Sequence, residues 1–318
     1  MGTGTIGTPA LWIGFNICVL ALLALDLGVF NRKAHVVSFR EAAVWSAVWI
    51  GLSLLFAGAL FLWYGPEVGS QFLTGYLIEK SLSVDNIFIF VLLFSSFAVP
   101  AEYQHRVLFW GVLGAIVMRG ALIGLGTALV ETFHWVLYLF GAFLVITGIR
   151  LALHQERDVQ PDKNPIVRLA RRLFPVTEDY QGARFAVRRD GRWWITPLLV
   201  VLLLLESTDL IFALDSIPAI FAITTDPFIV YTSTILAILG LRSLYFLLAG
   251  SIERFGYLKY GLAAILVLVG IKMLIADLYH MPIALSLGLI ACILAISIGA
   301  SLFTSRTSQD ADQASHGS

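Results

Sequence analysis

The chain has 318 residues, of which 58% are hydrophobic and only 13% are charged, and its formal net charge is zero. A soluble domain carries about 25% charged residues, so this composition excludes an ordinary soluble protein, and the zero net charge offers no basic surface for nucleic acid. The composition therefore indicates an all-α polytopic membrane protein with the lipid bilayer as its main partner.

Apolar runs that can cross a bilayer need about 20 residues. Runs of this kind predict nine transmembrane helices, at residues 10–30, 41–63, 71–98, 106–130, 134–153, 195–223, 228–250, 257–279 and 282–303. The first run has no basic region before it and no evident cleavage site, so we expect a retained span. Cys18 and Cys292 lie in the first and last runs, which predicts membrane-buried packing residues rather than a disulfide or a redox pair.

Basic residues are confined to alternate connections between the spans. Arg32 and Lys33 follow the first span, Arg106 follows the third, and the long connection 154–194 is rich in arginine. The connections between these carry acidic residues or no charge. The positive-inside rule then predicts that the N-terminus lies outside and the C-terminus inside.

The connection 154–194 is the only sizeable polar segment within the membrane domain, which we place at residues 1–304. Residues 164–174 predict a short amphipathic basic helix at the inner leaflet, and Asp190-Gly191 predicts the turn of a short β-hairpin. A plain solvated linker is the alternative. The small polar residues of 305–318 predict a disordered cytoplasmic tail.

Spans three to five and spans six to eight correspond in order. The first helix of each set carries acids, the second carries a central arginine (Arg119 and Arg242), and the third ends in a similar glycine-containing motif (Gly148 and Gly270). Because each set has three spans, the second copy would enter the membrane from the opposite side. The sequence thus predicts an inverted repeat, as in many secondary transporters whose site lies at the midplane.

Acidic residues interrupt the apolar runs of spans three and six. Span three contains Glu79 and Asp85, and span six contains Glu206, Asp209 and Asp215. A carboxylate at the centre of a membrane helix costs roughly 2.5–3.5 kcal/mol on insertion scales. Acids kept at this cost indicate a functional site.

Polar residues spaced three or four apart share a helix face: Glu79, Ser83 and Asn86 in span three, and Glu206, Asp209, Ala213 and Ser216 in span six. Asp85 and Asp215 fall off these faces, so one ideal helix cannot aim all of the acids at one point. Pro218 cannot donate to the carbonyl of Leu214 and crowds it. We therefore predict a kink at Pro218 that frees a carbonyl beside Asp215 for a cation.

The predicted metal ligands are hard oxygen donors: Asp85, Asn86, Asp209 and Asp215, with Glu79, Glu206, Ser216 and backbone carbonyls as further candidates. No histidine or cysteine lies among them, which favours Mn²⁺, Mg²⁺ or Ca²⁺ over Zn²⁺ or Cu⁺. Met118 could add a thioether, although a methionine in a span is usually a packing residue.

A structural role is the alternative for these acids. Arg119, Arg242 and Lys80 could pair with them and simply hold the helices together. Five acids face two central arginines, however, so up to three negative charges need protons or a cation. We favour cation binding or transport, with the arginines orienting the acids through ion pairs.

The stretches EKSLSVDN, ESTDLIFALDSIPAIFAITTDPFIV, LGLRSLYFLLAG and LKYGLAAILVLVGIKMLIADLYHMPIALSLG together resemble the TerC family, and most closely its Alx branch. The resemblance covers nearly the whole chain. It implies a multi-pass protein of the bacterial inner membrane, from a family named for tellurium resistance whose Alx-like members are associated with Mn²⁺ export. The family's acidic motifs fall on Glu79, Asp85, Asn86, Glu206, Asp209 and Asp215. Thr234 departs from the asparagine that the family often has there.

These observations together lead us to expect a secondary transporter that exports Mn²⁺ or a similar divalent cation, with protons as the candidate coupling ion. We expect no enzyme activity and no permanently bound cofactor. A membrane redox enzyme would need histidine pairs within spans or a cysteine pair, and the sequence has neither. The alternative is a non-transporting membrane partner that delivers metal to exported enzymes or scaffolds a complex through residues 154–194.

Overall fold

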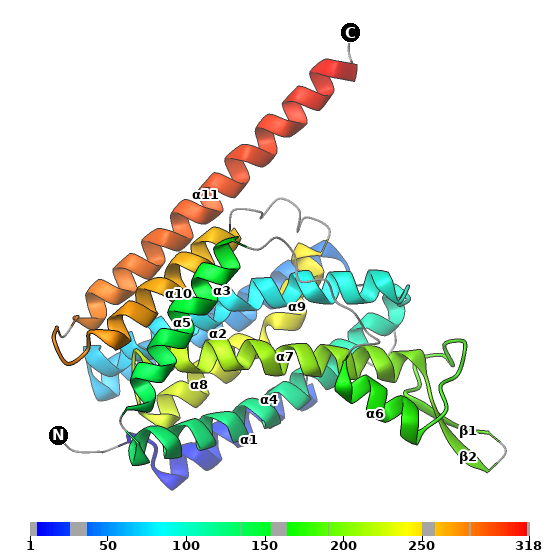
Figure 1. The fold of residues 1–318 in the computed structure, drawn as a ribbon, viewed down its shortest axis with the longest axis horizontal. Helices are drawn as coiled ribbons and strands as arrows, with labels where there is room; N and C mark the ends of the chain where they lie inside the picture. Colours follow the sequence, from blue (N-terminus) through cyan, green and yellow to red (C-terminus); the bar gives the residue numbers. More distant parts are fainter. Residues whose placement is uncertain are drawn as a thin grey trace.

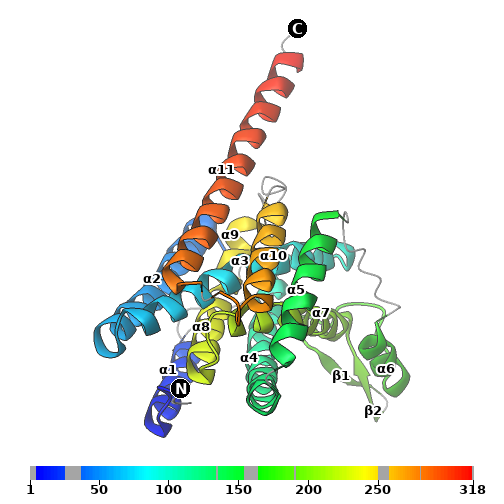
Figure 2. The same cartoon turned by 60° about the vertical axis from the view of Figure 1, so that its left-hand side comes forward.

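The computed structural model describes residues 5–25, 37–133, 135–153, 164–189, 191–249, 258–279 and 281–316, with side chains up to residue 301. The chain forms a bundle of helices with one small hairpin, and the last helix projects beyond the bundle (Figures 1 and 2).

The helices are α1 (Pro9–Leu25), α2 (Phe39–Tyr64), α3 (Pro66–Ser96), α4 (Ala101–Thr132), α5 (Val136–Leu153), α6 (Pro165–Leu173), α7 (Pro197–Phe221), α8 (Pro227–Leu239), α9 (Leu241–Leu248), α10 (Leu258–Leu274) and α11 (Ile283–His316). The hairpin strands are β1 (Ala186–Arg189) and β2 (Arg192–Ile195). Each of the nine predicted apolar ranges contains a helix over most of its length.

Capping residues in the sequence set several helix starts. The Ser38 hydroxyl accepts a hydrogen bond from the backbone N–H of Glu41 at the start of α2, and the Asp226 carboxylate accepts one from Phe228 at the start of α8. Proline occupies the first position of both α3 and α8, where its missing N–H is not needed. Gly65 separates α2 from α3 with φ of +94°, a conformation that favours glycine.

Six helical segments in the described chain are long and apolar enough to cross a membrane: α2, α4, α5, α7, α8 with α9, and α11. Their outward faces leave large apolar side chains exposed, including Leu62 at 85% and Leu55 at 73%. Such faces suit lipid, so the chain is a multi-pass helical membrane protein.

Helix ends differ in places from the sequence predictions. The predicted span 228–250 matches the apolar segment Pro227–Leu248, in which a turn at Gly240 separates α8 from α9. The kink at Pro218 stays a prediction: α7 runs as a helix through Pro218 to Phe221, and Pro218 has no N–H to donate to the carbonyl of Leu214. The backbone of residues 305–316 belongs to α11, since no glycine or proline interrupts it before Gly317.

The core lies where α3, α4, α7 and α8 meet. Helix α3 packs against α7 and α8, α4 packs against the same two helices, and α5 packs against α10. Figure 1 shows α5 and α10 side by side and running in opposite directions. Around this core, α1 adds Phe15, whose ring lies 6.1 Å from that of Phe228.

The long connection forms α6 and the hairpin, as predicted, at one end of α7 (Figure 1). The strands are antiparallel, with Ala186 opposite Ile195, and Gly191 of the turn has φ of +76°; Asp190 lies outside the described residues. The Tyr180 hydroxyl donates to the carbonyl of Phe97 at 2.7 Å, and the Arg106 guanidinium lies 5.2 Å from the ring centre of Phe185. The connection is thus fastened to the turn between α3 and α4.

Candidate functional site

Arg119 of α4 is the centre of a buried polar network between α3 and α7. Its Nε donates to Asp209 Oδ2 at 3.2 Å and its Nη2 donates to Asp209 Oδ1 at 2.9 Å. Its Nη1 donates to Glu79 Oε1 and, at 3.1 Å, to the hydroxyl of Ser216. Three helices are therefore joined by one guanidinium through charge-assisted hydrogen bonds.

The network is closed to solvent. Arg119 and Glu79 are each 1% exposed and Asp209 is 2% exposed. Asn86 donates from Nδ2 to Asp209 Oδ1 at 3.3 Å. Two carboxylates and one guanidinium leave a net charge of −1, and Glu79 Oε2 and Asn86 Oδ1 are buried without a hydrogen-bond partner among the described residues. Unsatisfied buried acceptors of this kind call for a proton, a water or a cation.

The helix faces explain why these residues meet. Glu79 and Asn86 are seven residues apart in α3, and Asp209 and Ser216 are seven residues apart in α7, so each pair lies on one face. Helix α3 packs against α7, and α4 packs against α7, which brings Arg119 to both pairs. The predicted shared faces therefore converge.

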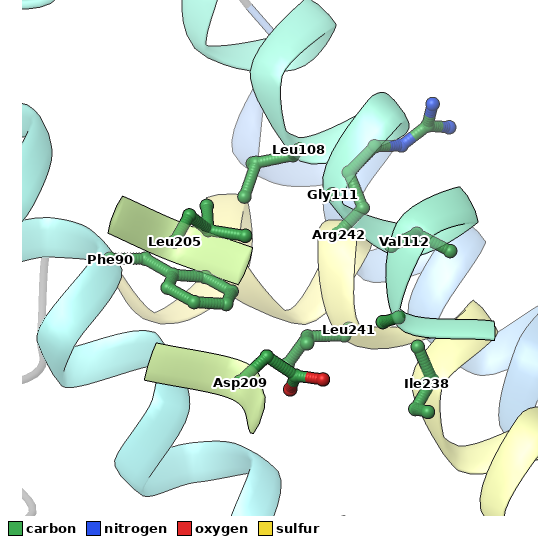
Figure 3. Close-up of a pocket in the computed structure, with 10 residues that line it drawn as sticks. Phe90, Leu108, Gly111, Val112, Leu205, Asp209, Ile238, Leu241 and Arg242 are labelled. Carbon is green, nitrogen blue, oxygen red and sulfur yellow. The ribbon is translucent and has the colours of Figure 1, made fainter. Parts of the chain in front are cut away.

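Glu206 is half-buried one turn from Asp209 and packs on Gly114 of α4. A Cβ atom added at Gly114 would lie 2.1 Å from Glu206 Oε1, so the carboxylate in this position would have to shift to make room for alanine. Close by, Asp209 borders a cavity of about 10 Å³, close to the volume that holds one water. Figure 3 shows the Asp209 carboxylate at this cavity and the Arg242 guanidinium pointing away from it.

Arg242 lies in α9 and its Nη1 is 3.0 Å from His105 Nε2, at the start of α4. It is 8% exposed. This contact joins α9 to α4. The role predicted for Arg242, orienting the acids, stays a prediction.

Lys80 is a site residue whose role the sequence did not indicate. Its ammonium donates to the carbonyl of Ala237 at 3.3 Å, in the last turn of α8. A Cβ atom at Gly240 would lie 2.7 Å from Lys80 Nζ. Lys80 therefore contacts the end of α8 beside the turn at Gly240.

The predicted ligand set is not assembled as a whole. The described residues contain no group of three or more His, Cys, Asp or Glu side chains that could hold a metal ion. Asp85 is half-buried and Asp215 is buried, on other faces of α3 and α7 than Asn86 and Ser216.

The remaining predicted residues lie beside the network. The Ser83 hydroxyl donates to the backbone carbonyl of Glu79 at 2.8 Å, and Met118 is half-buried next to Arg119. Thr234 is fully buried, and its hydroxyl has no hydrogen-bond partner in the described part of the chain. Cys18 and Cys292 are free, as predicted, and lie exposed on the outward faces of α1 and α11.

The Integral membrane protein TerC family model matches residues 64–309, a stretch that contains the whole network. The chain belongs to the TerC family. This confirms the resemblance noted from the acidic motifs, and the family is one of integral membrane proteins.

Relatives of this TerC protein match along almost their entire length. A Myxococcus xanthus protein described as an uncharacterized membrane protein is 56% identical over 308 residues, covering 97% of each chain. The Escherichia coli K12 protein named "Putative membrane-bound redox modulator Alx" is 54% identical over 303 residues, covering 92% of this chain and 94% of the relative. A Rickettsia bellii membrane protein is 41% identical over 293 residues, covering 92% and 96%. No solved structure matches this chain.

Proposed function

We propose that this TerC protein is a carrier that exports a hard divalent cation, with Mn²⁺ as the expected substrate, across the bacterial inner membrane. The observation that supports it is the buried network in which Arg119 bridges Glu79 and Asp209 while Glu79 Oε2 and Asn86 Oδ1 remain unsatisfied. Buried charges in a membrane helix bundle usually mark an ion pathway.

Charge balance suggests how the cation binds. The network as described has a net charge of −1, and buried net charge is unfavourable. A divalent cation that takes the place of the guanidinium between Glu79 and Asp209 brings the charge of the two carboxylates to zero. A proton on Glu79 neutralises the network with Arg119 in place, which gives protons a route to couple with the cation.

The donor atoms favour a hard cation. The carboxylates of Glu79 and Asp209 and the hydroxyl of Ser216 bond Arg119, and Asn86, which bonds Asp209, has an unsatisfied amide oxygen. Oxygen donors of this kind suit Mn²⁺, Mg²⁺ and Ca²⁺ better than Zn²⁺ or Cu⁺. Resemblance to the Alx branch, associated with Mn²⁺ export, favours Mn²⁺ within this group.

The contacts between α5 and α10 support the inverted repeat. A Cβ atom at Gly148 would lie 2.8 Å from the carbonyl oxygen of Ala263, and one at Gly270 would lie 2.7 Å from that of Gly141. The alignment that matches Gly148 to Gly270 also matches Gly141 to Ala263, so the two contacts are equivalent under exchange of the repeats. The pairing is antiparallel, as expected for copies inserted from opposite sides.

Connections predicted to share a membrane face also contact each other. Tyr180 of the long connection bonds Phe97 beside the basic turn between α3 and α4. At the other end, the hydroxyl of Thr5 near the N-terminus donates to Asp226 between α7 and α8 at 2.7 Å. These contacts support the predicted pairing of connections on each membrane face, and the assignment of the N-terminus to the outside rests on the positive-inside rule.

Manganese loading of cells tests the function. Bacteria without manganese exporters would receive the protein, its Asp209→Asn variant, or a Glu102→Gln control at an exposed acid of α4. We expect the protein and the control to lower cellular Mn under Mn²⁺ load, and Asp209→Asn to have no effect at equal membrane abundance. Equal Mn lowering by Asp209→Asn would refute the proposal. Liposome uptake of Mn²⁺, Mg²⁺, Ca²⁺ and Zn²⁺ would then rank the ions.

The name of the Alx relatives suggests a second candidate, a redox function. A thiol-based redox function would require Cys18 or Cys292, the only cysteines of the chain. A Cys18→Ser/Cys292→Ser variant distinguishes the two: a carrier keeps full Mn²⁺ export without cysteines, whereas a thiol-based modulator loses its effect on a cytoplasmic redox probe.

A further inference from the structure

A cavity of about 930 Å³ opens at one end of the bundle. Its walls come from the ends of α3, α5, α7, α10 and α11 and from the turn after α7. Polar and charged side chains line it: Glu67, Gln71, Thr224, Lys272 and Asp277. These connections are the ones predicted to lie outside, so the cavity faces one side of the membrane.

Two helices lead from this cavity to the buried network. On α3, Gln71 lines the cavity, and Gly75 and Glu79 follow at intervals of four residues on the same face. On α7, the last residue, Phe221, lines the cavity, and Ser216 lies five residues before it, about 7.5 Å along the helix. At 1.5 Å per residue, about 12 Å of α3 separates Gln71 from Glu79.

Ile220 of α7 packs at the level of Gly75, which lies between Gln71 and Glu79 along α3. A Cβ atom at Gly75 would lie 3.2 Å from Ile220 Cγ2 and 2.9 Å from the hydroxyl of Ser233. Ile220 is fully buried and lies one turn from Ser216. Gly75, which is one turn from Glu79, therefore lets Ile220 pack directly against α3 and close the passage.

We propose that this cavity is the entrance through which water and the cation exchange with the Glu79–Arg119–Asp209 network, and that Ile220 packed on Gly75 is the gate, closed in this structure. The identity of the cation rests on the proposed function, whereas the position of the gate rests only on the packing of Ile220 against Gly75. An experiment can therefore refute the gate without refuting the proposed function, and the reverse.

Thiol accessibility tests the gate without any need for transport. In the full-length Cys18→Ser/Cys292→Ser protein, single cysteines are placed in the cavity (Gln71→Cys) or beyond the gate (Ser216→Cys). A positively charged, membrane-impermeant methanethiosulfonate reagent is then applied separately to each side of the membrane. Each reporter is examined with Ile220 intact, with Ile220→Ala, and with Ile217→Ala, which removes the same atoms from a neighbouring buried isoleucine of α7.

We expect the Gln71→Cys reporter to be labelled from one side in every background. The Ser216→Cys reporter should stay at background with Ile220 intact or with Ile217→Ala, and should reach the level of Gln71→Cys from the same side with Ile220→Ala. If the Ile220→Ala protein does not accumulate in the membrane, Ile220→Val is used instead, because it removes fewer atoms from the gate. Three outcomes would refute the proposed gate. Ser216→Cys could be labelled with Ile220 intact, it could stay unlabelled with Ile220→Ala or Ile220→Val, or it could be labelled from the side opposite to Gln71→Cys.

Discussion

Arg119 and Asp209 form a two-point contact, with two nitrogens of the guanidinium each donating to a different oxygen of the carboxylate, at 3.2 and 2.9 Å. Both side chains are almost completely buried. The pair fixes α4 against α7 at the position where the proposed cation binds. Removing either partner therefore has consequences for stability as well as for transport.

Replacing Arg119 by glutamine should destabilise the purified protein by about 3–5 kcal/mol, because it leaves buried carboxylates without their counter-charge. Mn²⁺ should restore part of this loss, since it supplies the missing positive charge. Thermal unfolding in detergent with and without Mn²⁺ measures both effects. Arg150→Gln, at an exposed arginine of α5, is the control. If Arg119→Gln unfolded at the same temperature as the parent, with or without Mn²⁺, the positive charge of Arg119 would not be needed to stabilise the buried carboxylates.

Asn86→Leu should separate binding from folding. Asn86 makes one long hydrogen bond of 3.3 Å to Asp209, so its loss should cost only about 0.5–1.5 kcal/mol. Its amide oxygen is an unsatisfied acceptor and therefore a candidate cation ligand. We expect a clear rise in the Mn²⁺ concentration for half-maximal uptake into liposomes. A variant with normal uptake would remove Asn86 from the ligand set.

Alanine at Gly148 and at Gly270 should have matching effects. Each added methyl group would lie under 3.0 Å from a backbone oxygen of the facing helix, so α5 and α10 must move apart, at a cost of about 1–3 kcal/mol. Gly124→Ala is the control, because its added Cβ meets no atom within 4 Å and alanine favours helix. Unfolding in detergent measures the stability of the three alanine variants. A large loss of stability at only one of Gly148 and Gly270 would contradict the equivalence of the repeats.

Tyr180→Phe tests the attachment of the long connection. It removes the 2.7 Å hydrogen bond to Phe97 and should cost about 0.5–1.5 kcal/mol. Burial raises the pKa of the Tyr180 phenol, so the protonated form is favoured in the fold. The difference in unfolding free energy between the variant and the parent should be present below the ordinary tyrosine pKa of about 10. It should diminish as the pH rises through the higher pKa that Tyr180 has in the folded protein. Unfolding curves at neutral and alkaline pH would show this.

Much of the helical framework could be predicted, because a membrane leaves the backbone few alternatives to the helix. The shared faces of Glu79 with Asn86 and of Asp209 with Ser216 follow from helical spacing alone, and the structure brings both faces to Arg119. Arg119 was expected to pair with acids. Its position at the centre depends on how three helices pack, which spacing does not specify.

The turn at Gly240 has a physical explanation, because glycine weakens a helix in the middle of an apolar run. The motif Gly240-Leu241-Arg242 contained a signal for this break, since glycine followed by a charge is unfavourable in a continuous span. The contact of Lys80 with Ala237 could not be predicted, because it joins residues far apart in sequence.

Arg119 also bears on how such a carrier would reset after releasing its cargo. A binding pocket lined by bare carboxylates would have to stay loaded, or pick up other ions, before it could reorient through a medium of low dielectric constant. Here a tethered guanidinium already compensates most of that charge. An unloaded return step would then need no accompanying metal, and the direction of net flux would be set by the gradients on either side.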